Sequence, residues 1–176
     1  MRRIILWAPL AAFVLFVILV TAYLRAPSDT AIRSHLVGRP LPQFALQPAV
    51  PSHPGLGAAD LRTGQPRLLN VFASWCGPCV VEAPQLMALR RRGVPIDAIA
   101  IRDRSEDVAA FLARYGDPFE RIGSDPNTQV QIALGSSGVP ETFVIDGRGT
   151  VRYQHIGPIA DSDVPALIAA WEAARQ

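Results

Sequence analysis

The sequence of 176 residues contains no lysine: all 17 of its basic residues are arginines, and 15 acidic residues leave a formal net charge of +2. Without a domain-wide cationic excess, a nucleic-acid-binding function is not expected. Cysteine is almost absent too, since the only two lie in the pentapeptide WCGPC at positions 75–79. This excludes a disulfide-stapled mini-protein and a four-cysteine metal site. With only three scattered histidines, His35, His53 and His155, we expect no metal site.

One long apolar segment stands apart from this composition. Residues 4–24 carry no charge and, at ~1.5 Å per residue, make a helix about long enough to cross a ~30 Å hydrocarbon core. We predict a cytoplasmic tail (1–3), a transmembrane anchor (4–24), a tether (25–37) and a folded domain (38–176). The alternative is a cleaved signal peptide with its cleavage site near residues 20–22. Both interpretations place the domain across the membrane.

After residue 38, strand and helix patterns alternate. Short apolar runs predict buried strands, and apolar residues at i, i+3, i+4 and i+7 predict amphipathic helices. The predicted elements are an edge strand and loop (41–50), a loop (52–66), a strand (67–73), a helix (78–92), a strand (94–101), a helix from Ser105, a hairpin (142–146 and 150–155) and a helix from about 163. This order predicts an α/β fold whose central sheet is covered on both faces.

The cysteine pair indicates redox chemistry. It lies between a predicted buried strand and a helix, so Cys76 is placed at the helix N-terminus, where free N–H groups and the helix dipole favour a thiolate. We therefore predict that Cys76 is the nucleophile and that Cys79 resolves the mixed disulfide. A structural staple or half a zinc site is the alternative, but the loop is too short to restrict the unfolded chain much and no second ligand pair has metal spacing.

Glu82 is the next candidate because it lies at i+3 from Cys79, on the helix face predicted to be buried. A carboxylate there is suited to accept the proton of the Cys79 thiol, with its own pKa raised by burial. Alternatively, Glu82 turns to solvent or caps a backbone group.

Residues 72–79 (FASWCGPC), Pro84 and the distant pair Val139-Pro140 resemble the thioredoxin superfamily. The resemblance covers about residues 38–175 and is strongest to the membrane-anchored CcmG/DsbE group of cytochrome c maturation. It implies a thioredoxin-like fold with a central mixed sheet, and a cis Val139–Pro140 bond whose neighbouring backbone pairs with an extended substrate.

The same resemblance assigns roles within the site. It implies that Trp75, Val139, Pro140 and Glu141 bind the substrate, and that Glu82 and Glu141 form an acidic pair. This pair would replace the buried aspartate of ordinary thioredoxins, because Asn70 occupies that position. The Gly77-Pro78 dipeptide and residues 135–137 (GSS) depart from the subgroup's usual sequence, which bears on the choice of substrate.

By resemblance, the protein reduces the heme-binding cysteines of apocytochrome c in the periplasm, with no cofactor beyond the redox-active Cys76–Cys79 disulfide. The implied partners are apocytochrome c or a thiol protein of the maturation complex, and a membrane electron donor of the DsbD/CcdA kind. The expected location is the bacterial inner membrane, with a single span. The alternatives are a TlpA-like reductase for copper-site assembly or general thiols, a copper chaperone and an oxidising disulfide donor.

Overall fold

The computed structural model describes residues 2–25 and 34–175, and the chain divides into two compact units, Met1–Ala31 and Ile32–Gln176. The described part of the first unit is helix α1 (Arg2–Arg25), along which the side chains of Trp7, Phe13 and Phe16 are exposed. The described residues contain no helix with both the length and the apolar character that crossing a bilayer requires. The predicted anchor over residues 4–24 is therefore not confirmed.

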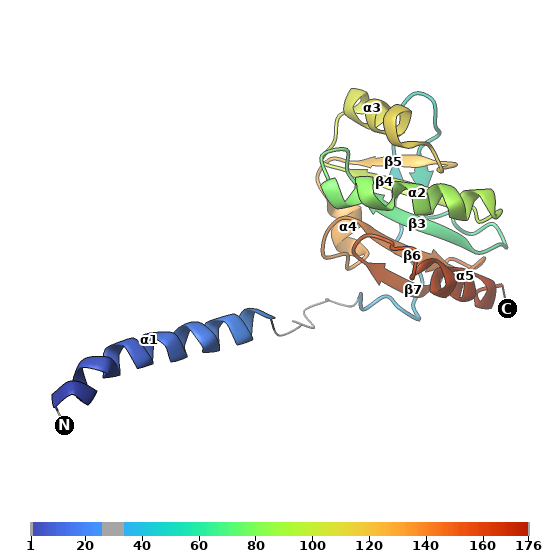
Figure 1. Ribbon diagram of the computed structural model, residues 1–176. Helices are drawn as coiled ribbons and strands as arrows, with labels where there is room; N and C mark the ends of the chain where they lie inside the picture. Colours follow the sequence, from blue (N-terminus) through green and yellow to red (C-terminus); the bar gives the residue numbers. More distant parts are fainter. Residues whose placement is uncertain (1, 26–33, 176) are drawn as a thin grey trace. The chain divides into compact units, whose positions relative to one another are not determined.

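The second unit is built on a five-stranded mixed sheet, as the thioredoxin resemblance implied (Figure 1). Its strand order is β5-β4-β3-β6-β7, in which β3, β4 and β5 are parallel while β6 is antiparallel to β3 and β7. The strands are β3 (Arg67–Phe72), β4 (Ile96–Ile101), β5 (Ile122–Asp125), β6 (Glu141–Ile145) and β7 (Val151–Ile156).

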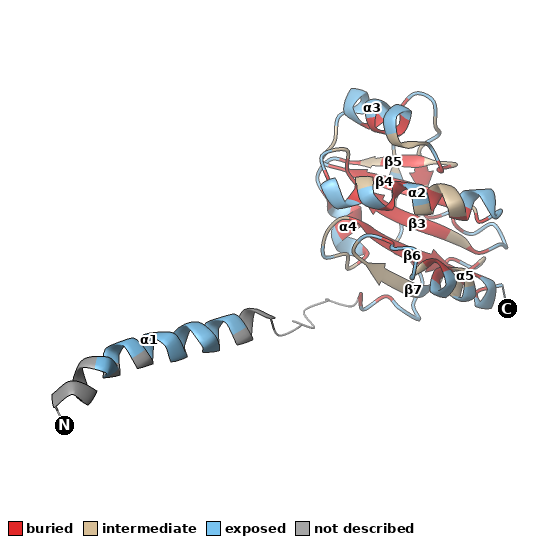
Figure 2. Ribbon diagram, viewed as in Figure 1, coloured by how far each residue is buried: buried red, intermediate tan, exposed pale blue. Residues whose placement is uncertain are grey.

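Helices cover this sheet. Helix α2 (Gly77–Arg91) contacts both α3 (Ser105–Tyr115) and α5 (Val164–Ala173), so these three helices form one layer (Figure 1). The short helix α4 (Gln129–Ala133) contacts β5. Every residue of β4 and β6 is buried, and because neighbouring side chains point to opposite faces, both faces of the sheet are covered, as predicted (Figure 2).

The amphipathic patterns place the helices correctly. Leu86 and Leu89 of α2 are buried under the sheet, and Gly93, at a φ of 82°, follows the helix in a left-handed conformation that favours glycine. The predicted stripes of α3 and α5 are likewise buried at Val108, Phe111, Leu112, Val164, Leu167 and Trp171, while Tyr115 and Ile168 are half-buried.

Two parts of the chain differ from the prediction. The segment 41–50 contains β1 (Ala45–Leu46), which pairs with β2 (Leu56–Gly57) in a separate two-stranded sheet, and it joins the main sheet where Pro48 forms an isolated antiparallel bridge to Gly123. The edge strand of the main sheet on this side is β5, which the sequence did not reveal because it reads Ile-Gly-Ser-Asp. A Cβ at Gly123 would lie 2.8 Å from Leu46 Cβ, so the close packing of β1 on β5 requires glycine there.

The predicted tether falls mostly outside the described residues, which leave out 26–33. Its last part packs on the domain: the backbone N–H of Ser34 donates to Gln154 Oε1 (2.7 Å), and the Ser34 hydroxyl donates to the Leu134 carbonyl (2.5 Å). Leu36 is buried as well. Residues 34–37 therefore contribute to the packing of the domain.

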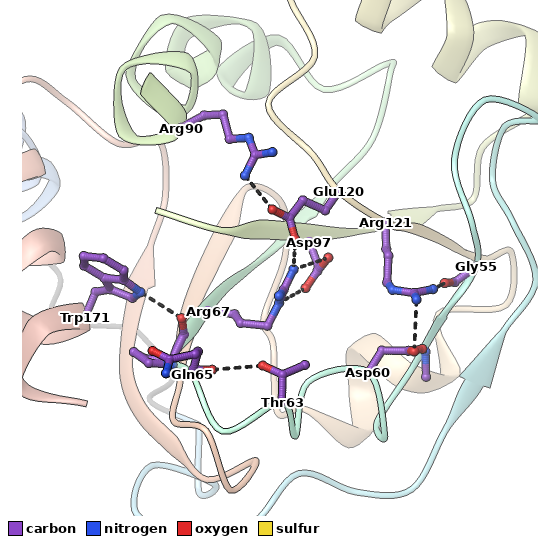
Figure 3. A network of polar contacts seen from close by, with 12 residues as sticks. Gly55, Asp60, Thr63, Gln65, Arg67, Arg90, Asp97, Glu120, Arg121 and Trp171 are labelled. Carbon is purple, nitrogen blue, oxygen red and sulfur yellow. Dashed lines mark hydrogen bonds and ion pairs between the residues drawn. The ribbon is translucent and has the colours of Figure 1, made fainter. Parts of the chain in front are cut away.

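At the end of the sheet away from the cysteines, a network of charged side chains links β3, β4 and α2 (Figure 3). Arg67 donates to both carboxylate oxygens of Asp97, at 2.5 and 3.1 Å, and Glu120 accepts from Arg67 and from Arg90. Asp97 is fully buried, so its charge is balanced by a bidentate guanidinium. This network holds the start of β3 to its neighbours and contains no residue of the predicted site.

Candidate active site

The cysteine pair lies where β3 passes into α2. Cys76 is the N-cap residue of α2, and its Sγ accepts a hydrogen bond from the backbone N–H of Cys79 at 3.2 Å. The two cysteines form a disulfide with 5.3 Å between their Cα atoms, and both are almost fully buried. The positive end of the helix dipole thus acts directly on the first sulfur, the position that stabilises a thiolate after reduction.

Glu82 does not turn to solvent: it is fully buried on α2, one turn beyond Cys79. Its Oε1 accepts from Asn70 Nδ2 at 2.9 Å, and its Oε2 accepts from the backbone N–H of Ile159 at 3.1 Å. Burial raises the pKa of the Glu82 carboxyl from 4.5 to about 7, against the opposing effect of these two hydrogen bonds. At neutral pH this carboxyl is therefore able both to take up and to release a proton.

The second sulfur and this carboxyl share one small cavity. Cys79, Glu82 and Asn70 all line it, together with apolar residues that include Phe72 and Leu86, and its volume is about 10 Å³. No charged residue other than Glu82 is among its lining residues. In such apolar surroundings a buried thiol does not ionise readily, so a neighbouring proton acceptor has a clear chemical use.

The predicted cis bond between Val139 and Pro140 is confirmed. Glu141 pairs with Val71 in the register of β3 and β6, which puts Pro140 at the end of the sheet from which α2 starts. The Pro140 carbonyl accepts from the Gly157 N–H at 3.0 Å, whereas the backbone N–H and carbonyl of Val139 make no hydrogen bond within the described part of the chain. Those two groups are the ones expected to pair with an extended substrate.

Glu141, by contrast, is not brought to the cysteines. Thr142 pairs with Asn70 across the two strands and shares its face of the sheet, so the side chain of Glu141, one position earlier, points to the other face. It is fully buried and accepts from the Ser136 hydroxyl, from the Ser137 N–H at 3.0 Å and from Gln154 Nε2. These contacts hold the loop before Pro140, and Glu82 faces Cys79 without a second acid.

Trp75 directly precedes the nucleophile Cys76 in the sequence and is 59% exposed. Its indole N–H donates to the carbonyl of Arg102 at 3.2 Å, and Arg102 has a φ of 47°, a left-handed backbone that is unusual for arginine. Trp75 also lines a groove of about 490 Å³ together with Arg102, Arg104, Arg114 and Tyr115. The groove therefore combines aromatic rings with three exposed arginines, and Asp103 and Asp107 line it as well.

Several contributors to the site were not identified from the sequence. Asn70 was noted only as the replacement of an aspartate, and neither the Ile159 N–H nor Gln154 carries a local signal. Asp103 accepts from both the backbone N–H and the hydroxyl of Ser74, at 2.5 and 2.6 Å, which fixes the turn before Trp75. Within residues 2–25 and 34–175, no three His, Cys, Asp or Glu side chains gather to hold a metal ion.

Comparisons with known proteins agree with this geometry. Residues 36–169 match the Redoxin family model. The thiol:disulfide interchange protein HelX of Rhodobacter capsulatus is 37% identical over 138 residues, covering 78% of each chain, and DsbE of Pseudomonas fluorescens is 38% identical over 160 residues, covering 90% of this chain and 88% of its own. The crystal structure of a putative thiol:disulfide interchange protein DsbE from Chlorobium tepidum aligns with a TM-score of 0.63 at 30% identity, over 83% of this chain and all of its own. The chain therefore belongs to the Redoxin family and, within the thioredoxin superfamily, to the CcmG/DsbE group of thiol:disulfide oxidoreductases.

Proposed function

We propose that the chain is a membrane-anchored reductant that keeps the heme-binding cysteines of apocytochrome c in the dithiol form on the periplasmic side of the bacterial inner membrane. The similarity to DsbE and HelX proteins supports the assignment, and the uncharged segment 4–24 supports a single-span anchor. The orientation follows from the chemistry: a dedicated, tethered reductant has a use in a compartment that otherwise drives disulfide formation, so the domain faces the periplasm and residues 1–3 face the cytoplasm.

The observation that carries this proposal is the fully buried Glu82, in one cavity with Cys79 and with a pKa raised by burial to about 7. A protein that releases its client quickly needs the second thiol to ionise on demand. A carboxyl with a pKa near ambient pH is the acceptor best matched to that task. An oxidising disulfide donor has less need of it, because Cys79 then has to remain in a disulfide until the client attacks.

The reaction proceeds in two exchanges. The Cys76 thiolate attacks one sulfur of the client disulfide, forms a mixed disulfide and expels the other client sulfur as a thiolate. The Cys79 thiol then gives its proton to Glu82, and the resulting thiolate attacks Cys76 Sγ, which releases the first client sulfur. The client has gained two electrons, and the Cys76–Cys79 disulfide has formed. A membrane donor of the DsbD/CcdA kind supplies the two electrons that, with two protons, restore the dithiol.

Substrate binding is proposed for the surface around Cys76. An extended client strand pairs with the unpaired N–H and carbonyl of Val139, beside Pro140, while the exposed ring of Trp75 packs on the client segment on the other side. Glu141 contributes indirectly, because its buried carboxylate holds Ser136 and Ser137 in the loop that precedes Val139.

Substrate trapping tests this function. In the Cys79→Ser variant of the full chain the resolving thiol is missing, so the client stays attached to Cys76 as a mixed disulfide. We expect apocytochrome c or a maturation-complex thiol protein to be recovered from a membrane extract under non-reducing conditions. The Cys76→Ala, Cys79→Ser double variant is the control and should trap nothing. Recovery of copper-site assembly proteins alone would transfer the assignment to the TlpA-like alternative.

Equilibration with glutathione tests the direction of electron flow. A reductant should have a potential near that of thioredoxin, about −270 mV, rather than near the oxidant DsbA, about −120 mV. A value at the DsbA end would contradict the reductant assignment, although the exchange chemistry of Cys76 and Cys79 would still hold.

A further inference from the structure

Asn70 lies at the centre of the buried polar cluster around Glu82, and the exchange steps described above assign no role to Asn70 itself. It is fully buried in β3, and its amide nitrogen donates to Glu82 Oε1 at 2.9 Å and to Thr142 Oγ1 at 3.0 Å. Its amide oxygen, also buried, has no hydrogen-bond partner among the described residues. A side chain with both donor bonds made and its acceptor left over is arranged for the ionised form of Glu82.

The mechanism, however, needs Glu82 in both forms. Once Glu82 has taken the proton of Cys79, its carboxyl bears a hydrogen that needs an acceptor, and leaving a buried donor unpaired costs about 1–3 kcal/mol. A half-turn of the amide would not supply that acceptor at a gain, because both amide hydrogens would then lie where the Asn70 oxygen now has no partner. In its present orientation the amide therefore favours the ionised form of Glu82, the form that is ready to accept a proton.

We propose that Asn70 is a positioning residue that holds Glu82 in the ionised form before the proton of Cys79 arrives: its amide nitrogen, fixed by Thr142, donates to the carboxylate and presents no acceptor to the protonated carboxyl. The proposal rests on the proton-acceptor role of Glu82 in the proposed function. It explains why an uncharged amide suits the position, since an aspartate would place a second buried negative charge beside Glu82.

The surroundings of Glu82 leave Asn70 as its principal side-chain partner. On α2 the other titratable group in the shared cavity is Cys79; β3 supplies Asn70, β6 supplies Thr142, and the loop before α5 supplies the Ile159 N–H. On that loop, Asp161 is exposed and accepts from Gln85. No described cation contacts Glu82, so its proton affinity is set by burial and by neutral donors, in agreement with a pKa raised to about 7.

Side-chain amide resonances of the ¹⁵N-labelled full-length chain test the proposal without any mutation of the cluster. We expect the Asn70 amide signals to shift with pH around the same midpoint as the Glu82 carboxyl carbon, near pH 7, because the hydrogen bond from Asn70 Nδ2 weakens when the carboxylate is protonated. Asn127, the only other asparagine, is exposed and serves as the internal control, with no such shift. Asn70 signals that stay constant while Glu82 titrates would overturn the proposal.

Two variants separate this inference from the proposed function. Asn70→Leu removes the donor to ionised Glu82, so the pH at which Cys79 attacks at half its maximal rate should rise by about one unit from its midpoint near pH 7. The attack at pH 7 should then be about fivefold slower. In a Glu82→Gln background, Asn70→Leu should leave the pH profile unchanged. If Glu82→Gln slows the attack but Asn70→Leu does not alter the profile, the role of Asn70 fails alone. If Glu82→Gln has no effect, the proton-acceptor role fails first.

Discussion

A carboxylate is completely buried at each end of the central sheet, but its hydrogen-bond partners are charged at one end and neutral at the other. Asp97, at the end away from the cysteines, receives two hydrogen bonds from the guanidinium of Arg67, which also bonds Glu120. Glu82, at the redox end, receives one bond from the neutral amide of Asn70 and one from a backbone N–H. The first arrangement stabilises the negative charge of Asp97, whereas the second allows Glu82 to gain and lose a proton.

The pKa values of the two acids reflect this difference. Burial raises the pKa of both carboxyls, but at Asp97 the hydrogen bonds and the positive charge of Arg67 oppose the effect of burial. At Glu82 the opposing groups are uncharged, and the pKa is raised to about 7. A buried acid with neutral partners is thus suited to proton transfer, and a buried acid with a bidentate cation is suited to holding strands together.

Breaking the ion pair should give the largest loss of stability. Arg67→Met leaves Asp97 buried without its cation, so we expect the free energy of unfolding to fall by about 3–5 kcal/mol. Urea denaturation at pH 7 measures it. The Arg67→Met, Asp97→Leu double variant should recover most of the loss, because it removes the unpaired charge. Neither variant should alter the rate of disulfide exchange of the folded protein, since the pair lies away from Cys76; a stable single variant would contradict this view of Asp97.

Raising the pH should reveal the cost of ionising Glu82. Because the folded-state pKa of about 7 lies above the unfolded value of 4.5, the folded chain holds more protons between these values, and its stability falls as the pH rises through that window. The contribution of this group amounts to about 3 kcal/mol. Urea denaturation of the oxidised protein at pH 4.5 and pH 7.5 should show this loss in the wild type, and Glu82→Gln should lack it. Equal pH dependence in the two proteins would show that Glu82 is not the group responsible.

The same substitution should slow chemistry at the redox end. Glu82→Gln keeps the size of the side chain but removes the proton acceptor, so the attack of Cys79 on a Cys76 mixed disulfide should slow by about 100-fold at pH 7. Rapid mixing with a preformed mixed disulfide measures this step alone. Glu172→Gln, on the exposed surface of α5, is the matched control and should react at the wild-type rate.

The sequence predicts those features of each end that depend on residues close together in the chain, and it misses those that depend on distant residues. Local periodicity correctly placed Leu86 and Leu89 in the core, and the spacing from Cys79 correctly put Glu82 on the same buried face. The pairing of Arg67 with Asp97 joins residues 30 positions apart and left no local trace. Strand β5 was missed because close packing against Leu46 requires Gly123, which interrupts the apolar run expected of a buried strand.

Glu141 shows a different limit of sequence analysis. The family pattern suggested an acidic pair with Glu82, yet the alternation of side chains along β6 sends Glu141 to the opposite face, where Ser136, Ser137 and Gln154 bind it. Which face a strand residue takes depends on the register of β3 with β6, and register is a property of the folded sheet. The role of Asn70 was hidden for the same reason, because its partners come from α2 and β6.

Two tryptophans, one near each end of the central sheet, give the smallest expected effects in this comparison. Each indole N–H donates to a backbone carbonyl, Trp171 to Pro66 at 2.9 Å and Trp75 to Arg102 at 3.2 Å, but only Trp171 and Pro66 are buried. Trp171→Phe should cost about 1–2 kcal/mol of unfolding free energy, because it leaves a buried carbonyl unpaired, with exchange kinetics unchanged.

Trp75→Phe should cost less than about 0.5 kcal/mol of unfolding free energy, since water replaces the lost donor. The KM for a disulfide-containing client peptide should rise a few-fold, because the ring loses its fixed position. Urea denaturation and steady-state kinetics of both variants provide the test, and a Trp75→Phe protein with unaltered KM would remove Trp75 from the client-binding surface.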